Sequence, residues 1–116
     1  MSINNAIASL AVKDLKSAVQ WYEKLLGRQA DSGHNPDVAE WKFEGGGGLQ
    51  VYQSDERPGK GSVTFDVSSI EDQIADLEKC GIDPGRRITT ETMKVVMIKD
   101  PDSNSIAFAE SISTLP

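Results

Sequence analysis

The sequence predicts an α+β domain in which two βαβββ modules form one curved mixed sheet with the helices on its convex side. An amphipathic helix follows an apolar strand near the N-terminus, and the same order returns about 55 residues later, followed again by short strand patterns. At 116 residues the chain has the size of one small domain, so residues 1–116 are expected to fold together. The modules span about 1–57 and 58–116, each too short to sustain a core alone.

The first module begins with a strand and a helix. Residues 6–12 are mostly apolar with small side chains interleaved, which predicts a short strand. Asp14 can cap the helix that follows, whose apolar residues recur every three or four positions: Leu15, Ala18, Val19, Tyr22, Leu25 and Leu26. Gly27 is placed to end this helix, because glycine readily adopts the left-handed conformation found there.

Two further strands follow in the first module. They are predicted at 38–43 and 49–53, on either side of the glycine run 45–48. The run is interpreted as a turn, because four glycines cannot hold a regular element cheaply. An exposed connector at 55–60 leads into the second module.

The second module repeats this order. A strand is predicted at 61–67, Ser68 and Ser69 offer caps for the helix that follows, and Gly81 ends that helix. The remaining strand patterns lie at 86–89, 93–99 and 105–110, with a turn at 100–104.

A fixed offset tests the internal repeat. Adding 55 leads from apolar residues of the first module to apolar residues of the second: Leu10 to Phe65, Val12 to Val67, Leu15 to Ile70, Val19 to Ile74 and Tyr22 to Leu77. In the last strand the offset becomes 57, which maps Leu49 to Ile106 and Val51 to Phe108.

The apolar side chains of these strands are expected to face the helices, because neighbouring residues of a strand point in opposite directions. The opposite face then carries a mainly small and polar set: Ile7, Ser9, Ala11, Gln50, Tyr52, Ser62, Thr64, Asp66, Ser105, Ala107 and Ala109. This set is compatible with a concave, ligand-accessible surface and equally with a plain solvent-exposed face.

Composition excludes several classes of protein. The chain has 12 basic and 18 acidic side chains and a net charge of −6, which argues against nucleic-acid and anionic-membrane partners. No apolar run approaches the roughly 20 residues that span a bilayer, and the N-terminus does not resemble a signal peptide. A single cysteine, Cys80, cannot form an internal disulfide. We therefore expect a cytoplasmic protein.

Two segments resemble a known family. The stretch 10–27, which ends in Tyr22-Glu23-Lys24-Leu25-Leu26-Gly27, resembles the first strand–helix unit of the vicinal oxygen chelate superfamily. That superfamily contains glyoxalase I, bleomycin-resistance proteins and extradiol dioxygenases. Asp100-Pro101-Asp102-Ser103-Asn104 resembles the turn before its last strand. The resemblance covers nearly the whole chain and implies the glyoxalase/bleomycin-resistance fold, but the superfamily hosts many chemistries.

The resemblance also implies where a metal would bind. Catalytic members usually hold a divalent metal on the concave face, with ligands from the first and last strands of each module. Ile7 and Ser62 stand at the first-strand positions, and Gln50 and Ala107 at the last-strand positions. Two of these have no donor atom, and neutral oxygens seldom hold a transition metal alone. His34, the only histidine, falls in a predicted loop, so we expect no metal and no other cofactor.

Other catalytic motifs are missing from the sequence. His34 has no serine or cysteine partner in a recognisable arrangement, and the 45–48 run lacks the Lys-Ser/Thr that follows a phosphate loop. We therefore assign no catalytic residue, and the sequence favours a binding protein over an enzyme.

The bleomycin-resistance branch implies a homodimer that sequesters a small molecule in a cleft. On this hypothesis the ligand-binding residues are Trp41, Gln50, Tyr52, Ser62, Thr64 and Asp66. One alternative is a metal-independent or atypical metal-dependent lyase or isomerase in the same cleft, with Asp66, Tyr52 or Ser62 in the reaction. Another is an interaction module without a small ligand.

Overall fold

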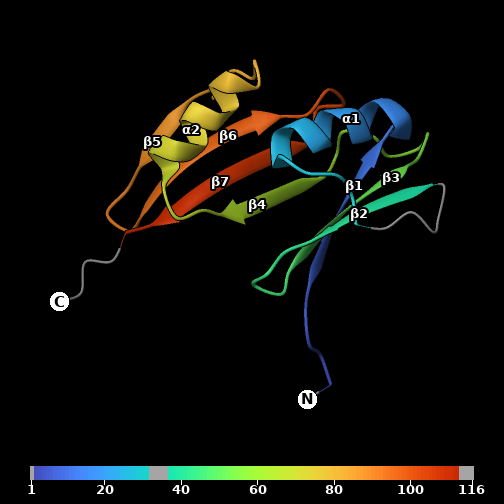
Figure 1. The fold of residues 1–116 in the computed structure, drawn as a ribbon, viewed down its shortest axis with the longest axis horizontal. Helices are drawn as coiled ribbons and strands as arrows, with labels where there is room; N and C mark the ends of the chain where they lie inside the picture. Colours follow the sequence, from blue (N-terminus) through green and yellow to red (C-terminus); the bar gives the residue numbers. More distant parts are fainter. Residues whose placement is uncertain (1, 32–36, 113–116) are drawn as a thin grey trace.

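The computed structural model describes residues 2–31 and 37–112, so His34 lies outside the described residues. The first half contains β1 (Ile7–Val12), α1 (Leu15–Leu26), β2 (Val38–Lys42) and β3 (Gly48–Gln53). The second contains β4 (Ser62–Asp66), α2 (Ile70–Lys79), β5 (Arg87–Thr89), β6 (Met93–Lys99) and β7 (Ser105–Ser111) (Figure 1). Each strand end lies within one residue of its predicted position.

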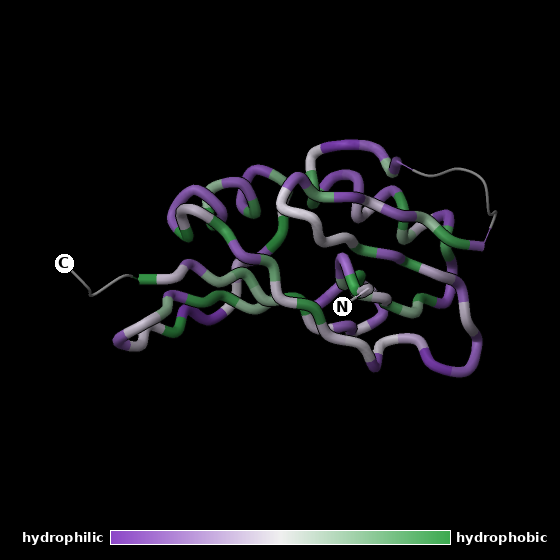
Figure 2. Tube along the Cα trace, turned by 90° about the horizontal axis from the view of Figure 1, so that it is seen from below, coloured by the Kyte–Doolittle hydropathy of each residue, from purple (hydrophilic) through white to green (hydrophobic). Residues whose placement is uncertain are grey.

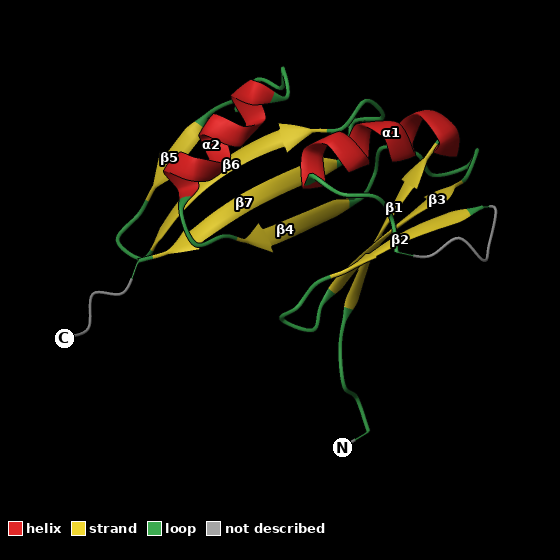
Figure 3. Ribbon diagram, viewed as in Figure 1, coloured by secondary structure: helices red, strands yellow, loops and turns green. Residues whose placement is uncertain are grey.

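The strands form two hydrogen-bonded sheets, in the orders β1-β3-β2 and β4-β7-β6-β5. In each sheet the first strand of the half pairs in parallel with the last, and the other pairings are antiparallel. Both helices lie on the same side of the sheets (Figure 3). The α+β class is therefore confirmed, although the predicted single curved sheet is divided between its two halves.

The edge strands β1 and β4 contact each other where the two halves meet, and we call this boundary the seam. The second half has the predicted βαβββ order, whereas the described part of the first half has three strands. Between α1 and β2, a backbone bond reaches β2 from a residue outside a regular element: the Asp31 N–H donates to the Glu40 carbonyl over 2.8 Å.

The internal repeat is present in the strand register. Ile7 lies opposite Gly48 in the first half, and Ser62 lies opposite Ser105 in the second. These two pairs are related by the offset of 55 in the first strand and 57 in the last. The change of offset therefore falls in the connections between strands, and the pairing is the same in both halves.

The helix caps repeat as well. Oε1 of Gln53 accepts a hydrogen bond of 3.0 Å from the Leu15 backbone N–H, and Oε1 of Glu110 accepts one of 2.7 Å from that of Ile70. Both acceptors lie at or near the ends of the last strands, and both donors are first residues of helices. Each half thus satisfies one of the N–H groups that a helix start leaves without an intrahelical partner.

The core lies between the sheets and the helices. The helix-facing residues predicted from alternation are largely buried there: Leu10, Val12, Leu49, Val51, Ile106 and Phe108. In Figure 2 hydrophobic and hydrophilic residues alternate along the regular elements, as expected for elements with one buried face. α1 ends as predicted, with Gly27 at φ 76° and its N–H bonded to the Glu23 carbonyl.

Hydrogen bonds of Asn104 and Cys80 join the two halves, and Asn104 also accepts one bond from within the second half. Nδ2 of Asn104 donates to the Ala11 carbonyl over 2.9 Å, and the Gly61 backbone N–H donates to Oδ1 of Asn104 over 2.8 Å. Near the helix ends, the Cys80 thiol donates to the Lys24 carbonyl over 3.3 Å. The side chain of Asn104 is fully buried, so these bonds supply the partners that a buried amide requires.

Candidate functional site

An open cavity of about 1120 Å³ lies at the seam. It is bordered by the start of β1, the turn between β2 and β3, the outer edge of β4 and the C-terminal parts of both helices. Six successive residues, 62–67, line it: the five residues of β4 and Val67, which follows the strand. Within the described residues this edge of β4 pairs with no strand, so backbone groups as well as side chains border the space.

Three phenylalanines supply the aromatic part of the lining: Phe43, Phe65 and Phe108. The rings of Phe43 and Phe65 meet edge to face across the seam, with centroids 5.6 Å apart, and Phe65 stacks on Phe108 at 5.7 Å. Phe108 is buried, whereas Phe43 and Phe65 are only half-buried. Ring surface of these two residues therefore remains accessible.

Polar and charged side chains also line the cavity. Ser62, Thr64 and Asp66 project from β4 and are exposed, and the helices contribute a second polar group: Lys24, Gln73, Asp76, Lys79 and Cys80. The described lining thus combines apolar rings with hydroxyl, carboxylate and ammonium groups, which is the usual composition of a small-molecule site.

The structure brings only some of the predicted ligand-binding residues to the cavity. Ser62, Thr64 and Asp66 line it, whereas Gln50 and Tyr52 lie half-buried on β3 and do not. The amide of Gln50 is already engaged on the sheet. Its Oε1 accepts from Oγ of Ser9 over 3.4 Å, and its Nε2 donates to Oε2 of Glu40 over 3.3 Å.

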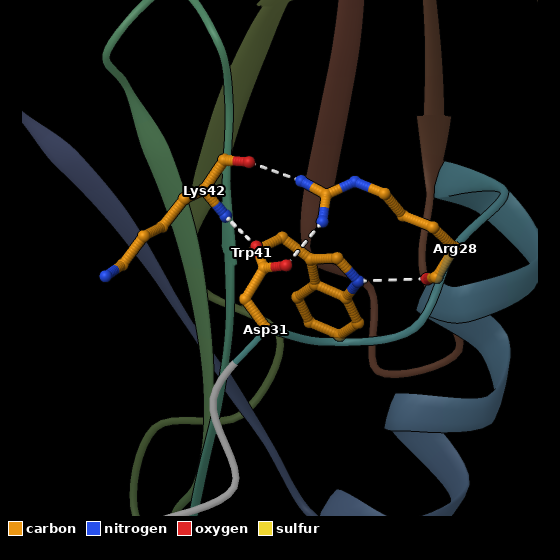
Figure 4. Close-up of polar contacts among 4 residues, drawn as sticks. All are labelled: Arg28, Asp31, Trp41 and Lys42. Atoms are coloured by element: carbon orange, nitrogen blue, oxygen red, sulfur yellow. Dashed lines mark hydrogen bonds and ion pairs between the residues drawn. The ribbon is translucent and has the colours of Figure 1, made fainter.

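The structure places Trp41 in the core and not at the cavity. Its side chain is fully buried, and it lies opposite Leu49 on the helix-facing side of the first sheet. Its Nε1–H donates to the Arg28 carbonyl over 3.1 Å (Figure 4). A ring with no exposed surface and a satisfied N–H is a core residue, not a ligand contact.

The residues after α1 are tied to the edge of β2 by a network that contains Trp41 (Figure 4). Nη1 of Arg28 contacts Oδ1 of Asp31 over 2.8 Å, and Nη2 of Arg28 donates to the Lys42 carbonyl. The Lys42 backbone N–H donates to Oδ2 of Asp31 over 2.7 Å. This bond, followed by the guanidinium of Arg28, lowers the pKa of the Asp31 carboxyl. Arg28 also lies 5.9 Å above the ring centroid of Phe43 and thereby supports the cavity wall.

The four positions implied for a metal do not fit one. Ile7 and Ser62 border the cavity, but Gln50 and Ala107 do not, and only the serine and glutamine have donor atoms. Across 2–31 and 37–112, no three His, Cys, Asp or Glu side chains form a group that could hold a metal ion. Divalent metals in proteins need charged or imidazole donors, which this set lacks.

Sequence reasoning missed two features of the site. The cavity reaches the C-terminal parts of both helices, which alternation within strands could not indicate. On the face turned away from the helices, the open face, β6 adds exposed apolar side chains: Met97 is 47% exposed and lies opposite Ala107. The alternation of residues 93–99 is the sequence signal that places Met97 on the open face.

The chain matches the Glyoxalase/Bleomycin resistance protein/Dioxygenase superfamily over residues 4–108. It belongs to this superfamily. A search of curated protein sequences finds no significant match. No helix in the described part of the chain has the length and apolar character needed to cross a membrane.

Several solved structures resemble this chain over almost its whole length. A glyoxalase/bleomycin resistance protein from Catenulispora acidiphila has 27% identity and a TM-score of 0.84, covering 98% of this chain and 100% of its own. TnmS3, an antibiotic binding protein from Streptomyces sp. CB03234, has 19% identity and a TM-score of 0.80, with coverages of 97% and 99%. Lactoylglutathione lyase from Agrobacterium tumefaciens has 18% identity and a TM-score of 0.75, with coverages of 90% and 91%.

At 19% and 18% identity, the last two similarities show a shared fold.

Proposed function

We propose that this protein binds and sequesters a small molecule in the seam cavity without the help of a metal. The observation that carries the proposal is the donor set at the four implied metal positions, where Ile7 and Ala107 offer no ligand atom. The cavity volume of about 1120 Å³ slightly exceeds the range of about 300–1,000 Å³ typical of ligand sites, so the cavity has room for a small molecule. The fold likeness to an antibiotic binding protein agrees with a binding role.

The binding residues we propose are Ser62, Thr64 and Asp66. All three are exposed on β4 and line the cavity, so they can hydrogen-bond a ligand without loss of core packing. Gln50 and Tyr52 lie farther along the open face, where they can contact only a ligand that extends beyond the cavity.

Metal analysis of the purified protein tests whether binding is independent of a metal. Purification without chelators followed by elemental analysis is expected to find no stoichiometric Zn, Ni, Mn or Fe. The melting temperature is expected to be the same with and without EDTA. A metal present at one equivalent per chain, whose removal abolishes ligand binding, would contradict the proposal.

A thermal-shift screen with a matched pair of variants tests whether a small molecule binds in the seam cavity. Thr64→Trp places a bulky ring at the cavity, and Thr89→Trp makes the same change on an exposed strand residue outside it. Amphipathic compounds that raise the melting temperature of the unaltered protein are expected to stabilise Thr89→Trp equally and Thr64→Trp much less. Equal stabilisation of both variants would place binding elsewhere.

A metal-independent enzyme is the second candidate, because Asp66 shares the cavity with the hydroxyl of Ser62. A carboxylate and a hydroxyl at one ligand can transfer protons. If any compound found in the screen is converted, the conversion should survive EDTA and be lost in Asp66→Asn. Binding without conversion in the unaltered protein favours sequestration.

We also propose that the protein is a cytoplasmic homodimer with no nucleic-acid partner. The outer strands β2 and β5 end the two sheets and can pair with another chain, and a net charge of −6 disfavours binding to phosphate backbones. Analytical ultracentrifugation should give twice the chain mass of 12.6 kDa.

A further inference from the structure

The seam cavity continues beneath the helices. Alternation along β4 places Thr64 on the open face, and Phe65 on the helix side, yet both line the cavity. Leu25 of α1 and Cys80 at the end of α2 line it as well. The space therefore passes the unpaired edge of β4 and enters the region between the sheets and the helices. We call the part lined by these helix-side residues the helix-side arm.

Two phenylalanines that line the arm, Phe43 and Phe65, are only partly covered by other residues of the protein. Phe43 comes from the first half of the chain and Phe65 from the second, and their rings meet edge to face across the seam. Both are half-buried, although the core next to them is closely filled by Phe108 and other apolar residues. Covering such ring surface with an apolar partner is favourable, and a flat ring does so with the geometry that aromatic pairs prefer.

The charges around the cavity cancel. The described lining contains two lysines, Lys24 and Lys79, and two aspartates, Asp66 and Asp76. The lysines lie in the last turns of the two helices, where an ammonium group offsets the partial negative charge of the helix end. The lining thus offers no net charge to an ionic ligand.

We propose that the helix-side arm receives a flat, uncharged aromatic ring system, which packs against Phe43 and Phe65 beside the Cys80 thiol. The inference rests on the proposed function and names the chemical class of its ligand. Polar groups on that ligand face Ser62, Thr64 and Asp66, while its rings lie under the helices. The ligand then contacts both halves of the chain.

A pair of fluorescent probes tests the ligand class. N-phenyl-1-naphthylamine is a neutral aromatic amine, and 1-anilinonaphthalene-8-sulfonate has the same ring skeleton with an anionic sulfonate. The neutral probe is expected to bind at one site per chain and more tightly than the sulfonate, because the protein has a net charge of −6. Tighter binding of the sulfonate would overturn the assignment of an uncharged ligand.

Cys80 reports on where the probe binds. It is the only cysteine in the chain, it is half-buried, and it lines the arm. A saturating neutral probe is therefore expected to slow the reaction of the Cys80 thiol with a disulfide reagent, in proportion to the fraction of protein bound. An unchanged rate at full occupancy would place the probe outside the arm and overturn the inference.

Matched variants separate filling of the arm from general disturbance of the core. Ala8 and Ala30 are both half-buried beside the core, but only Ala8 lines the cavity. Ala8→Phe is expected to abolish binding of the neutral probe, whereas Ala30→Phe retains it. Phe43→Leu keeps an apolar side chain without the ring and is expected to weaken binding about two- to tenfold. Circular dichroism checks that each variant is folded.

These results distinguish the inference from the proposed function. If screening compounds stabilise the unaltered protein but not Thr64→Trp, and still leave the Cys80 thiol unprotected, the small-molecule function stands and the aromatic arm is overturned. If Ala8→Phe and Ala30→Phe bind the neutral probe alike, the arm is overturned as well. If neither the probes nor any screening compound binds, both proposals fail.

Discussion

The hydroxyl of Tyr22 on α1 donates a hydrogen bond of 2.7 Å to Oδ2 of Asp100, 78 positions later in the chain. The carboxylate is only 4% exposed and also accepts hydrogen bonds from the backbone N–H of Asp102 and from the backbone and side chain of Asn104. A buried carboxylate is tolerated because each oxygen accepts two bonds. One helix of the first half is thereby fixed to the turn between β6 and β7 in the second.

Removing this bond should destabilise the protein. Tyr22→Phe keeps the ring in the core but leaves the Asp100 carboxylate with one donor fewer, which is expected to cost about 1.5–3 kcal/mol of unfolding free energy. Urea unfolding measures the change. Tyr52→Phe is the control, because Tyr52 is half-buried on β3 outside this network. Equal midpoints for both variants would show that the Tyr22 bond contributes nothing.

The same tyrosine predicts a loss of stability at high pH. Burial, followed by the hydrogen bond to Asp100, raises the pKa of Tyr22 well above its ordinary value. A group with a raised pKa in the folded state contributes stability below its unfolded pKa, near 10, and that stability is lost as the pH rises beyond it. The unfolding free energy should fall by up to about 1.4 kcal/mol per pH unit above pH 10.

The Tyr22→Phe variant isolates this contribution, since it keeps every other titrating group. Its unfolding free energy should depend less steeply on pH than that of the unaltered protein between pH 10 and 11. Parallel pH profiles for the two proteins would contradict the assignment to Tyr22.

Two glycines should respond very differently to the same substitution. Gly27 and Gly59 both have positive φ, 76° and 81°. A Cβ on Gly27 meets nothing within 4 Å, whereas one on Gly59 would lie 1.9 Å from the Asp102 carbonyl oxygen. Gly27→Ala is expected to cost about 1 kcal/mol, from backbone strain alone. Gly59→Ala adds steric conflict in a close-packed turn and should cost about 3 kcal/mol.

Chemical unfolding measures the unfolding free energies of the two glycine variants. Because both carry the same backbone strain, the difference between them gives the cost of the steric conflict at Gly59. Equal costs would mean that the connector before β4 moves away from Asp102 without penalty.

The repeated helix caps predict which substitutions of Glu110 are tolerated. Glu110→Ala leaves the Ile70 backbone N–H without its acceptor and should cost about 1 kcal/mol. Glu110→Gln keeps the acceptor oxygen and reproduces the arrangement of Gln53 and Leu15 in the first half, so it should cost less than half as much. Glu91→Ala, at an exposed turn position, is the control in thermal unfolding. A glutamine variant as unstable as the alanine variant would show that the negative charge is what stabilises the helix start.

The predicted elements correspond closely to the structure because their signals are local. The three- and four-residue spacing from Leu15 to Leu26 defines α1, and the left-handed Gly27 ends it where the sequence placed it. The positions of β1, β4 and their parallel partners were predicted from apolar patterns, and the offsets of 55 and 57 relate them because equivalent strands of a repeat share one register.

The position of Trp41 in the core could not be predicted from local pattern either. Aromatic residues on a strand that borders a cleft are plausible ligand contacts, but alternation alone does not say which face of the strand is buried. The pairing of Trp41 with Leu49 places its ring under α1, where the Arg28 carbonyl accepts its N–H. The contact between the rings of Phe43 and Phe65 could not be predicted from the sequence either, because the two residues belong to different halves of the chain.

The amino-acid order was sufficient for the α+β class, the internal repeat and the absence of donor atoms at Ile7 and Ala107, because each depends on residue type and near-neighbour spacing. The seam cavity and its lining depend on how two such halves pack. Ser62, Thr64 and Asp66 border a shared space with Lys24 and Cys80 only because β4 keeps an unpaired edge beside the helix ends. Contacts between residues tens of positions apart are set by packing of the whole chain, and no local pattern encodes them.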